Sequence, residues 1–213
     1  YVKALNDNTV TICIGPAGTG KTFLAVAAAV TELKKGTIDR IVMSRPAIEA
    51  GEERLGFLPG DLSQKVDPYL RPLYDALDDI LGVEQVKKYQ ERGVIEIAPL
   101  AYMRGRTLNR AMVLIDESQN ASLPTLKMAL TRLGEGSRMI LTGDVTQIDL
   151  PKVSDSGLER CASILNGIES IAVIRLSNRD VVRHKLVRDI VKAFEREEKR
   201  EEEKRGKASF KKN

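Results

Sequence analysis

The sequence predicts an α/β fold, with a mainly parallel sheet that is covered by helices on both faces. Three observations lead to this prediction. Strand and helix signals alternate along the chain, as they do in proteins built on parallel sheets. The segment 111–115 is almost purely apolar, which a strand buried on both faces requires. The glycine-rich segment 15–22 lies between a strand signal and a helix signal, at a strand-to-helix turn.

The chain begins with a short β-branched strand, 9–14, and a helix, 21–35, that is rich in good helix formers. Segment 38–44 is the second expected strand, and Pro46 ends it because proline cannot donate to a strand ladder. We expect 47–61 to be a long glycine-containing loop. Loops of this length in compact domains are usually functional or mobile.

The rest of the chain continues the alternation. Apolar side chains at helical spacing predict a helix over 67–81, and Ser122 can cap a helix whose leucines form one stripe over 123–133. Glycines that can end helices follow four of the expected ones, at Gly36, Gly82, Gly93 and Gly134. The other expected strands are 94–98, 111–115, 138–142 and 171–176, and the other expected helices are 84–92, 157–165 and 182–199.

We expect residues 1–194 to form one domain. The tail, 195–213, carries no large apolar side chain before Phe210, so we expect a frayed helix or a disordered segment there. The chain starts at Tyr1 rather than at a methionine, and we therefore expect it to be part of a longer protein.

The composition is typical of a soluble globular protein, with 42% hydrophobic and 30% charged residues. No apolar run approaches the roughly 20 residues that a membrane span needs, so we expect a cytoplasmic protein with no membrane contact. Cys13, Cys161 and the single His184 lack metal-site spacing, and both cysteines are expected to be reduced core residues. The net charge is only +4, which gives weak support for binding nucleic acid.

The glycine-rich turn has the form of a phosphate-binding loop. It matches G-x-x-x-x-G-K-[ST] in Gly15, Pro16, Ala17, Gly18, Thr19, Gly20, Lys21 and Thr22. Unpaired amides of such a loop and of the helix after it attract phosphate. Lys21 can then reach the β- and γ-phosphates, and Thr22 can offer its hydroxyl to Mg²⁺. The alternative is a chance glycine-rich turn, but the flanking strand and helix favour a P-loop NTPase.

Two acids, Asp116 and Glu117, directly follow the apolar strand 111–115. In a P-loop protein this is the Walker B position, where Asp116 binds Mg²⁺ directly or through water. Glu117 can orient and polarise an attacking water. The alternative is a pair of acids that merely ends a strand. A small-molecule kinase is disfavoured, because it would not carry a base that activates water.

A polar segment also follows the next expected strand, 138–142. Gln147 is our candidate for a sensor of the γ-phosphate, which would distinguish ATP from ADP, with Thr142 and Asp144 placed to support it. Without the upstream P-loop, this would be an ordinary exit from a strand.

These motifs and their order resemble the PhoH family, whose ATPases are related to superfamily 1 helicases. The matching segments are 15–22, 44–52, 55–62, 65–77, 103–107, 116–120, 142–147 and 180–184. The loop from Ala47 to Leu62 looks like the branch without a PIN nuclease domain, which normally has an N-terminal domain. The departures are small, since the family usually has alanine at Ser118 and threonine at Ser44. A glutamine that could read adenine usually lies upstream of the position of Tyr1.

The resemblance implies a single RecA-like domain that hydrolyses ATP with Mg²⁺ in RNA metabolism, in the manner of an RNA helicase or an RNA-processing ATPase. It also implies that Gln119 contacts the γ-phosphate or couples nucleotide state to conformation. A two-lobed helicase does not fit this length, and aromatic residues, at 4%, give no stacking platform for single strands. The alternative function is a nucleotide-gated adaptor of slow turnover that assembles with an endoribonuclease or a ribosome partner.

The sequence leaves two alternatives open for the role of each of four arginines. Arg183, at the start of the last expected helix, is our candidate for an arginine finger supplied to a neighbouring copy in a homo-oligomeric ring. Its alternative role is that of an exposed helix residue, which we also expect for His184. Arg45, Arg104 and Arg106 either bind RNA phosphates or a neighbouring subunit, or are solvated loop residues.

Overall fold

The computed structural model of the chain describes residues 1–46, 62–182, 186–187, 190 and 193–194. It divides the chain into two compact units, Tyr1–Asp180 and Val181–Asn213. The expected loop 47–61, Arg183 and His184 lie outside the described residues. Of the expected last helix, the described residues 186–187, 190 and 193–194 are helical.

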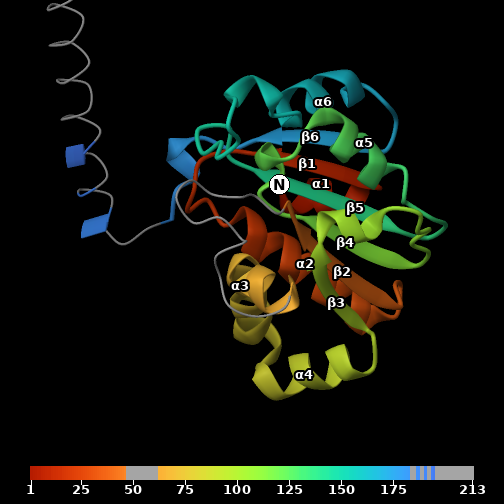
Figure 1. The fold of residues 1–213 in the computed structure, drawn as a ribbon. Coiled ribbons are helices and arrows are strands. Elements are labelled where there is room, and N and C mark those ends of the chain that lie inside the picture. Colours follow the sequence, from red (N-terminus) through yellow and green to blue (C-terminus); the bar gives the residue numbers. More distant parts are fainter. Residues whose placement is uncertain (47–61, 183–185, 188–189, 191–192, 195–213) are drawn as a thin grey trace, which may run out of the picture. The chain divides into compact units, whose positions relative to one another are not determined.

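The first unit is built on a six-stranded sheet in which every strand pair is parallel. Its strands are β1 (Val10–Ile14), β2 (Arg40–Arg45), β3 (Ile95–Pro99), β4 (Ala111–Ile115), β5 (Arg138–Gly143) and β6 (Ile171–Arg175). They lie in the order β3-β2-β4-β5-β1-β6, which the labels of Figure 1 follow from bottom to top. Strand β5 therefore separates β1 from β4, and the predicted α/β fold is confirmed.

The helices fill the connections between these strands. They are α1 (Val2–Asp7), α2 (Lys21–Lys35), α3 (Leu62–Leu81), α4 (Val83–Glu91), α5 (Leu123–Leu130) and α6 (Leu158–Leu165), with short 3₁₀ turns at Leu100–Met103, Ser118–Asn120, Val153–Asp155 and Asn178–Asp180. Helix α1 was not predicted, because six residues give too few positions for a helical period to show. Helix α3 begins at Leu62 rather than at 67, where the predicted helix began.

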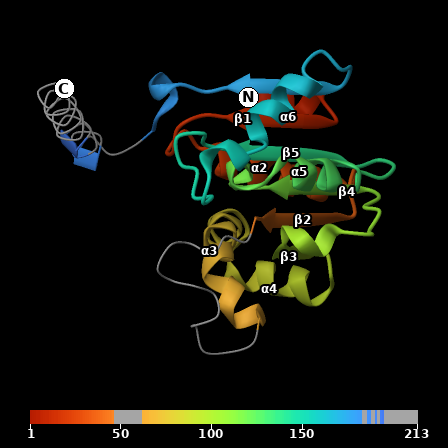
Figure 2. The ribbon, with the colours of Figure 1, turned by 45° about the horizontal axis from the view of Figure 1, so that its top comes forward.

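Alternating strand residues serve two separate cores, one on each face of the sheet. Val113 and Ile115 of β4 pack with α5 and α6, whereas Met112 and Leu114 pack with α2, α3 and α4. Figure 2 shows α3 and α4 beside β2 and β3, so that this second core extends to the β3 edge. Because both faces are covered, β4 has no exposed residue, as its apolar sequence predicted.

Helix α5 shows why one predicted boundary was wrong. Ser122 caps it by accepting the amide of Thr125 at 3.4 Å, as expected. The helix ends at Leu130 instead of 133, because the side chains of Thr131 and Arg132 take the carbonyl of Met128. Gly134 lies in the following turn, where a Cβ would come within 2.6 Å of the Leu108 carbonyl oxygen.

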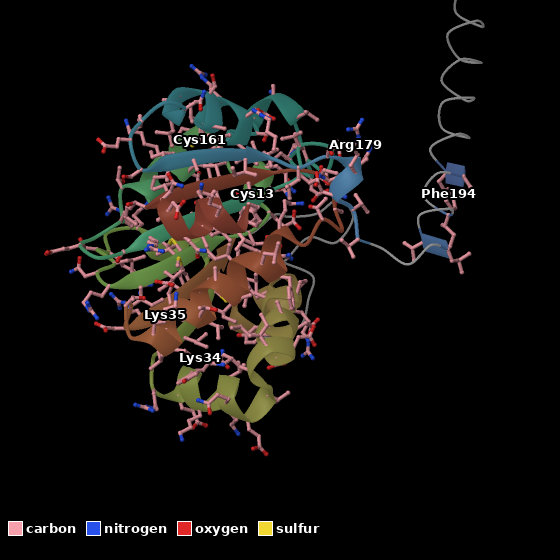
Figure 3. All side chains as sticks on the ribbon, turned by 180° about the vertical axis from the view of Figure 1, so that it is seen from behind. Cys13, Lys34, Lys35, Cys161, Arg179 and Phe194 are labelled. Carbon is pink, nitrogen blue, oxygen red and sulfur yellow. The ribbon has the colours of Figure 1, made fainter. Side chains whose placement is uncertain are left out.

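Both cysteines are buried free thiols, as the composition predicted. Figure 3 shows Cys13 on β1 and Cys161 on α6. Burial raises the pKa of both thiols, that of Cys13 to about 12. Within the described part of the chain, no helix combines the length and the apolar character needed to cross a membrane.

Candidate functional site

The carboxyl ends of β1, β2, β4 and β5 surround a cavity of about 400 Å³. In a parallel sheet all these strand ends meet at one edge, so residues far apart in the sequence come together there. The cavity is lined by Ala17, Gly18, Gly20, Lys21, Thr22, Phe23, Arg45, Pro72, Asp75, Ala76, Asp79, Asp116, Glu117, Gly143, Asp144 and Gln147.

The glycine-rich loop turns from β1 into α2 as its sequence requires. Gly18 and Gly20 have φ angles of 79° and 77°, in the left-handed region that a side chain disfavours. Gly15 is required for a different reason, since a Cβ there would lie 2.7 Å from the Cβ of Leu176. Thr19 donates its hydroxyl hydrogen to the carbonyl of Pro16 at 2.9 Å, which closes the loop on itself.

Lys21 crosses the loop that precedes it. Its Nζ donates to the carbonyl oxygens of Gly15 and Pro16, at 2.7 and 2.9 Å. The residue is only 9% exposed and also lines the cavity. In this structure the ammonium group therefore neutralises loop carbonyl dipoles rather than the carboxylates across the cavity.

Asp116 is the most heavily bonded carboxylate of the site. Its Oδ1 accepts from the hydroxyls of Thr22 and Thr142, at 2.7 and 2.5 Å. Its Oδ2 accepts from Arg45 Nε at 2.8 Å and from Arg45 Nη2 at 2.5 Å. A carboxylate has about four lone-pair directions, and four donors therefore use the capacity of Asp116.

The oxygens of Thr22 and Asp116 suit a magnesium ion. Mg²⁺ prefers oxygen ligands and is usually held by one or two carboxylates together with substrate phosphates and water. Among the described residues, no group of three or more His, Cys, Asp or Glu side chains could hold a metal on its own. The donor set therefore fits a Mg²⁺ ion that arrives with a nucleotide.

Arg45 belongs to this site, which the sequence analysis did not predict. It ends β2 next to β4, and Asp116 donates its amide to the carbonyl of Ser44 at 2.9 Å. Besides its two bonds to Asp116, Arg45 places Nη2 3.5 Å from Oε1 of Glu117. Its side chain is 16% exposed, so for Arg45 the alternative of a solvated loop residue is wrong.

Glu117 stands at the rim of the cavity with a strained backbone. Its φ and ψ angles are 52° and 38°, in the left-handed region that residues other than glycine seldom adopt. Such strain collects at functional sites, where the surrounding structure holds it. Gln119 Nε2 donates to Oε2 of Glu117 at 2.6 Å, and the carboxylate is 39% exposed.

Gln119 joins three parts of the site and is fully buried. Its Nε2 also donates to the carbonyl of Gln147 at 2.9 Å, and its Oε1 accepts the amide of Asp144 at 3.0 Å. The side-chain amide is thus engaged at both ends, and Gln119 does not line the cavity. This geometry favours the coupling role that was predicted for Gln119 over a direct phosphate contact.

Asp144 braces the phosphate loop from β5. Its Oδ2 accepts the amide of Ala17 at 2.8 Å, and its Oδ1 accepts the hydroxyl of Thr146 at 2.6 Å. Gln147 is exposed, lines the cavity and donates its amide to the carbonyl of Asp144 at 3.0 Å. Asp144 therefore supports Gln147 as expected, whereas Thr142 supports Asp116 instead.

Two of the other arginines named from the sequence, Arg104 and Arg106, are not among the residues that line the cavity. Arg106 makes two bonds to Glu96, at 2.5 and 2.7 Å, and this pairing lowers the pKa of the Glu96 carboxyl. Arg104 is exposed. Arg183 stays a prediction, since it lies outside the described residues.

The sequence analysis also missed the cavity wall formed by α3 and the start of α2. Phe23 is 47% exposed and follows Thr22 directly, and Asp75 and Asp79 face the cavity from α3. The spacing of these two acids, four residues apart on an amphipathic helix, was the available signal. Nothing in the sequence indicated that α3 packs beside the phosphate loop.

Together, the glycine-rich loop, the acid pair at the end of β4 and the parallel sheet define a P-loop NTPase domain of the RecA-like class. The chain belongs to the PhoH-like protein family, whose model matches residues 1–195.

Relatives agree with this assignment. A PhoH-like protein of Bacillus subtilis (strain 168) is 59% identical over 197 residues, which cover 92% of this chain and 61% of the relative. A PhoH-like protein of Synechocystis sp. is 58% identical over 198 residues, or 93% of this chain and 60% of the relative. Protein PhoH of Escherichia coli (strain K12) is 42% identical over 196 residues, or 91% of this chain and 55% of the relative. The chain thus spans little more than half the length of these relatives.

Solved structures with a similar arrangement are more distant in sequence. The helicase domain of Hef from Pyrococcus furiosus has a TM-score of 0.47 and 16% identity, over 84% of this chain and 37% of that one. The SWI2/SNF2 ATPase core of Sulfolobus solfataricus, solved with dsDNA, also has a TM-score of 0.47 and 16% identity, over 82% of this chain and 41% of that one.

Proposed function

We propose that this domain binds ATP together with Mg²⁺ and hydrolyses it, and that hydrolysis is coupled to RNA metabolism. One observation carries the proposal most directly. The hydroxyl of Thr22, from the phosphate loop, lies 2.7 Å from Oδ1 of Asp116, at the end of β4. These are the two groups through which P-loop NTPases hold the metal beside the β- and γ-phosphates.

The phosphate loop supplies the binding energy in this proposal. Amides from Gly18 to Thr22 and the start of α2 point positive dipoles at one spot, where a phosphate chain would lie. Lys21 leaves its loop carbonyls to pair with phosphate oxygens, which is the stronger, charge-assisted contact. Bound Mg²⁺ supplies charge neutralisation on the phosphates, and Thr22 and Asp116 are the residues that hold it.

Glu117 acts as the base that takes a proton from the attacking water. A general base must stand within hydrogen-bond reach of that water, and Glu117 lines the cavity with a partly exposed carboxylate. Gln119 fixes one of its oxygens at 2.6 Å and so sets the direction of the other. Gln147, which follows β5, senses whether a γ-phosphate is present and so distinguishes ATP from ADP.

RNA and an endoribonuclease or ribosome partner enter this proposal through the family resemblance. The alternative function, a nucleotide-gated adaptor of slow turnover, is favoured by one observation. Both carboxylate oxygens of Glu117 already face partners, Gln119 and Arg45, so the proposed base needs a rearrangement before it can act. ATP turnover that RNA stimulates supports the first function, and ATP-dependent assembly without RNA stimulation supports the second.

The ATPase proposal is tested with Lys21→Ala and Glu117→Gln. We expect Lys21→Ala to lose most affinity for ATP, because a charged phosphate contact disappears. We expect Glu117→Gln to bind ATP normally and to turn over at least about a hundredfold more slowly, as the loss of a general base implies. The measurements are titration with a fluorescent nucleotide and steady-state phosphate release.

Matched controls are Lys34→Ala, at the other end of α2 (Figure 3), and Glu169→Gln on the surface. Both should behave as the unchanged protein. Unaltered ATP binding in Lys21→Ala would contradict the phosphate-loop assignment, and unaltered turnover in Glu117→Gln would move the base elsewhere.

A further inference from the structure

Among the described residues, Arg45 is a cation that contacts both acids of the nucleotide site. Its guanidinium makes two hydrogen bonds to Asp116 and lies 3.5 Å from Glu117. Lys21 does not share this task, because its ammonium is bonded to two carbonyls of its own loop.

Arg45 is also placed where a nucleotide must pass. It lines the same cavity as Lys21, Thr22 and Glu117. Its position at the end of β2, next to β4, is fixed by the parallel register that pairs Ser44 with Ile115. The backbone therefore holds the arginine at the strand edge, from which its side chain reaches Asp116 and Glu117.

The contacts of Asp116 show why the arginine cannot keep its present partners when a nucleotide binds. The four donors on Asp116 leave no lone pair for a metal ion or its water ligands. A divalent cation beside the carboxylate also repels the guanidinium strongly in this buried setting. Of the four donors, the two from Arg45 belong to a cation, so these are the bonds that yield.

We propose that Arg45 is the arginine that stabilises the terminal phosphate of ATP, supplied by the same chain that holds the nucleotide. It pairs with Asp116 and Glu117 in this structure, and it binds γ-phosphate oxygens when ATP and Mg²⁺ occupy the site. Planar guanidinium groups match phosphate oxygens with two parallel bonds, as they match carboxylates. The inference rests on the proposed ATPase function and adds the source of its phosphate-stabilising arginine.

If Arg45 had only a structural role as the ion-pair partner of Asp116, its loss would have a different effect on nucleotide binding. If Arg45 only neutralises Asp116, its loss harms the binding of ATP and ADP equally, since both nucleotides share the β-phosphate and the metal. If Arg45 binds the terminal phosphate, its loss weakens ATP binding and spares ADP binding. The ratio of the two affinities therefore separates the roles.

The experiment compares Arg45→Gln and Arg45→Lys with the unchanged protein, in Mg²⁺, with a non-hydrolysable ATP analogue and with ADP. We expect Arg45→Gln to lose at least about tenfold in affinity for the analogue and less than about threefold for ADP, as the loss of a charged phosphate contact implies. Turnover should fall by about a thousandfold, the effect of removing an arginine finger. The analogue affinity and the turnover of Arg45→Lys should lie between those of the unchanged protein and those of Arg45→Gln. Lysine keeps the positive charge but loses the second parallel bond.

Arg106→Gln is the matched control, since it breaks another arginine–carboxylate pair with two hydrogen bonds, outside the cavity lining. Circular dichroism shows whether each variant is folded, independently of nucleotide binding, and Arg45→Lys replaces Arg45→Gln if the latter is not. Equal losses for both nucleotides, or no loss for the analogue, would overturn the role of Arg45 and leave the ATPase proposal standing. Absence of ADP and ATP binding by the unchanged protein would overturn both.

Discussion

Gln119 is the residue through which Glu117, the proposed base, is joined to the segment after β5 and to the phosphate loop. It holds Glu117 directly, and through Asp144 it connects to the amide of Ala17 in the loop. Because Gln119 does not line the cavity, it acts on a nucleotide only through these neighbours. It is therefore a positioning residue, and its loss should affect turnover more than binding.

We predict that Gln119→Ala lowers kcat at least about tenfold, because a misplaced base loses much of its advantage. ADP affinity and KM should change by less than about threefold, since no phosphate contact is lost. Steady-state kinetics and ADP titration give this split, and Gln90→Ala on α4 is the control. A rise in KM with unchanged kcat would instead show that Gln119 acts in nucleotide binding.

The thiol of Cys13 lies directly before the phosphate loop and should be inert in the folded protein. Burial raises its pKa to about 12, and the residue has no exposed surface. At pH 8 the reactive thiolate is therefore about one part in ten thousand of this thiol. We predict that a colourless disulfide reagent that releases a coloured thiolate detects neither Cys13 nor Cys161 within minutes, and detects both in denaturant. Rapid reaction of either thiol in the folded protein would contradict the buried placement.

Among the elements, strands were predicted better than helix boundaries. Strand β4 agrees with its prediction at both ends, because a run buried on both faces is bounded sharply by polar residues. Helix α1 was not predicted, and α3 and α5 differ from their predictions at one end, because side-chain capping and packing decide where a turn of helix is retained. The signal for these ends lies in tertiary contacts and not in the local sequence.

The site residues divide in the same way into those that a short segment fixes and those that depend on how strands and helices are arranged. The phosphate loop and the acid pair were predicted because each depends on a short segment with a fixed spacing. Arg45 and the α3 wall were not, because their places depend on which strand lies beside β4 and which helix packs on it. The order β2-β4-β5-β1 comes from long-range pairing, and nothing in the local sequence specifies it.

At the scale of the whole molecule, the question is whether one chain completes its own site. The sequence analysis expected a ring in which Arg183 reaches a neighbouring copy, because a single lobe offered no second source of an arginine. The structure provides Arg45 within the same chain, at the same cavity as Glu117. Since Arg183 lies outside the described residues, its role in a ring stays a prediction, and both roles can be tested by mixing inactive variants.

We predict that mixing Glu117→Gln with Arg45→Gln restores no turnover, because both residues serve one site in one chain and every site of a mixed assembly lacks one of them. The same mixture of Glu117→Gln with Arg183→Ala should recover turnover only if a neighbour supplies Arg183, since some sites then combine an intact Glu117 with an intact Arg183 from the next subunit. Phosphate release is measured after mass measurement has shown that the subunits have exchanged. Recovery in the first mixture would mean that Arg45 acts across a subunit boundary, which contradicts its assignment to the chain that holds the nucleotide.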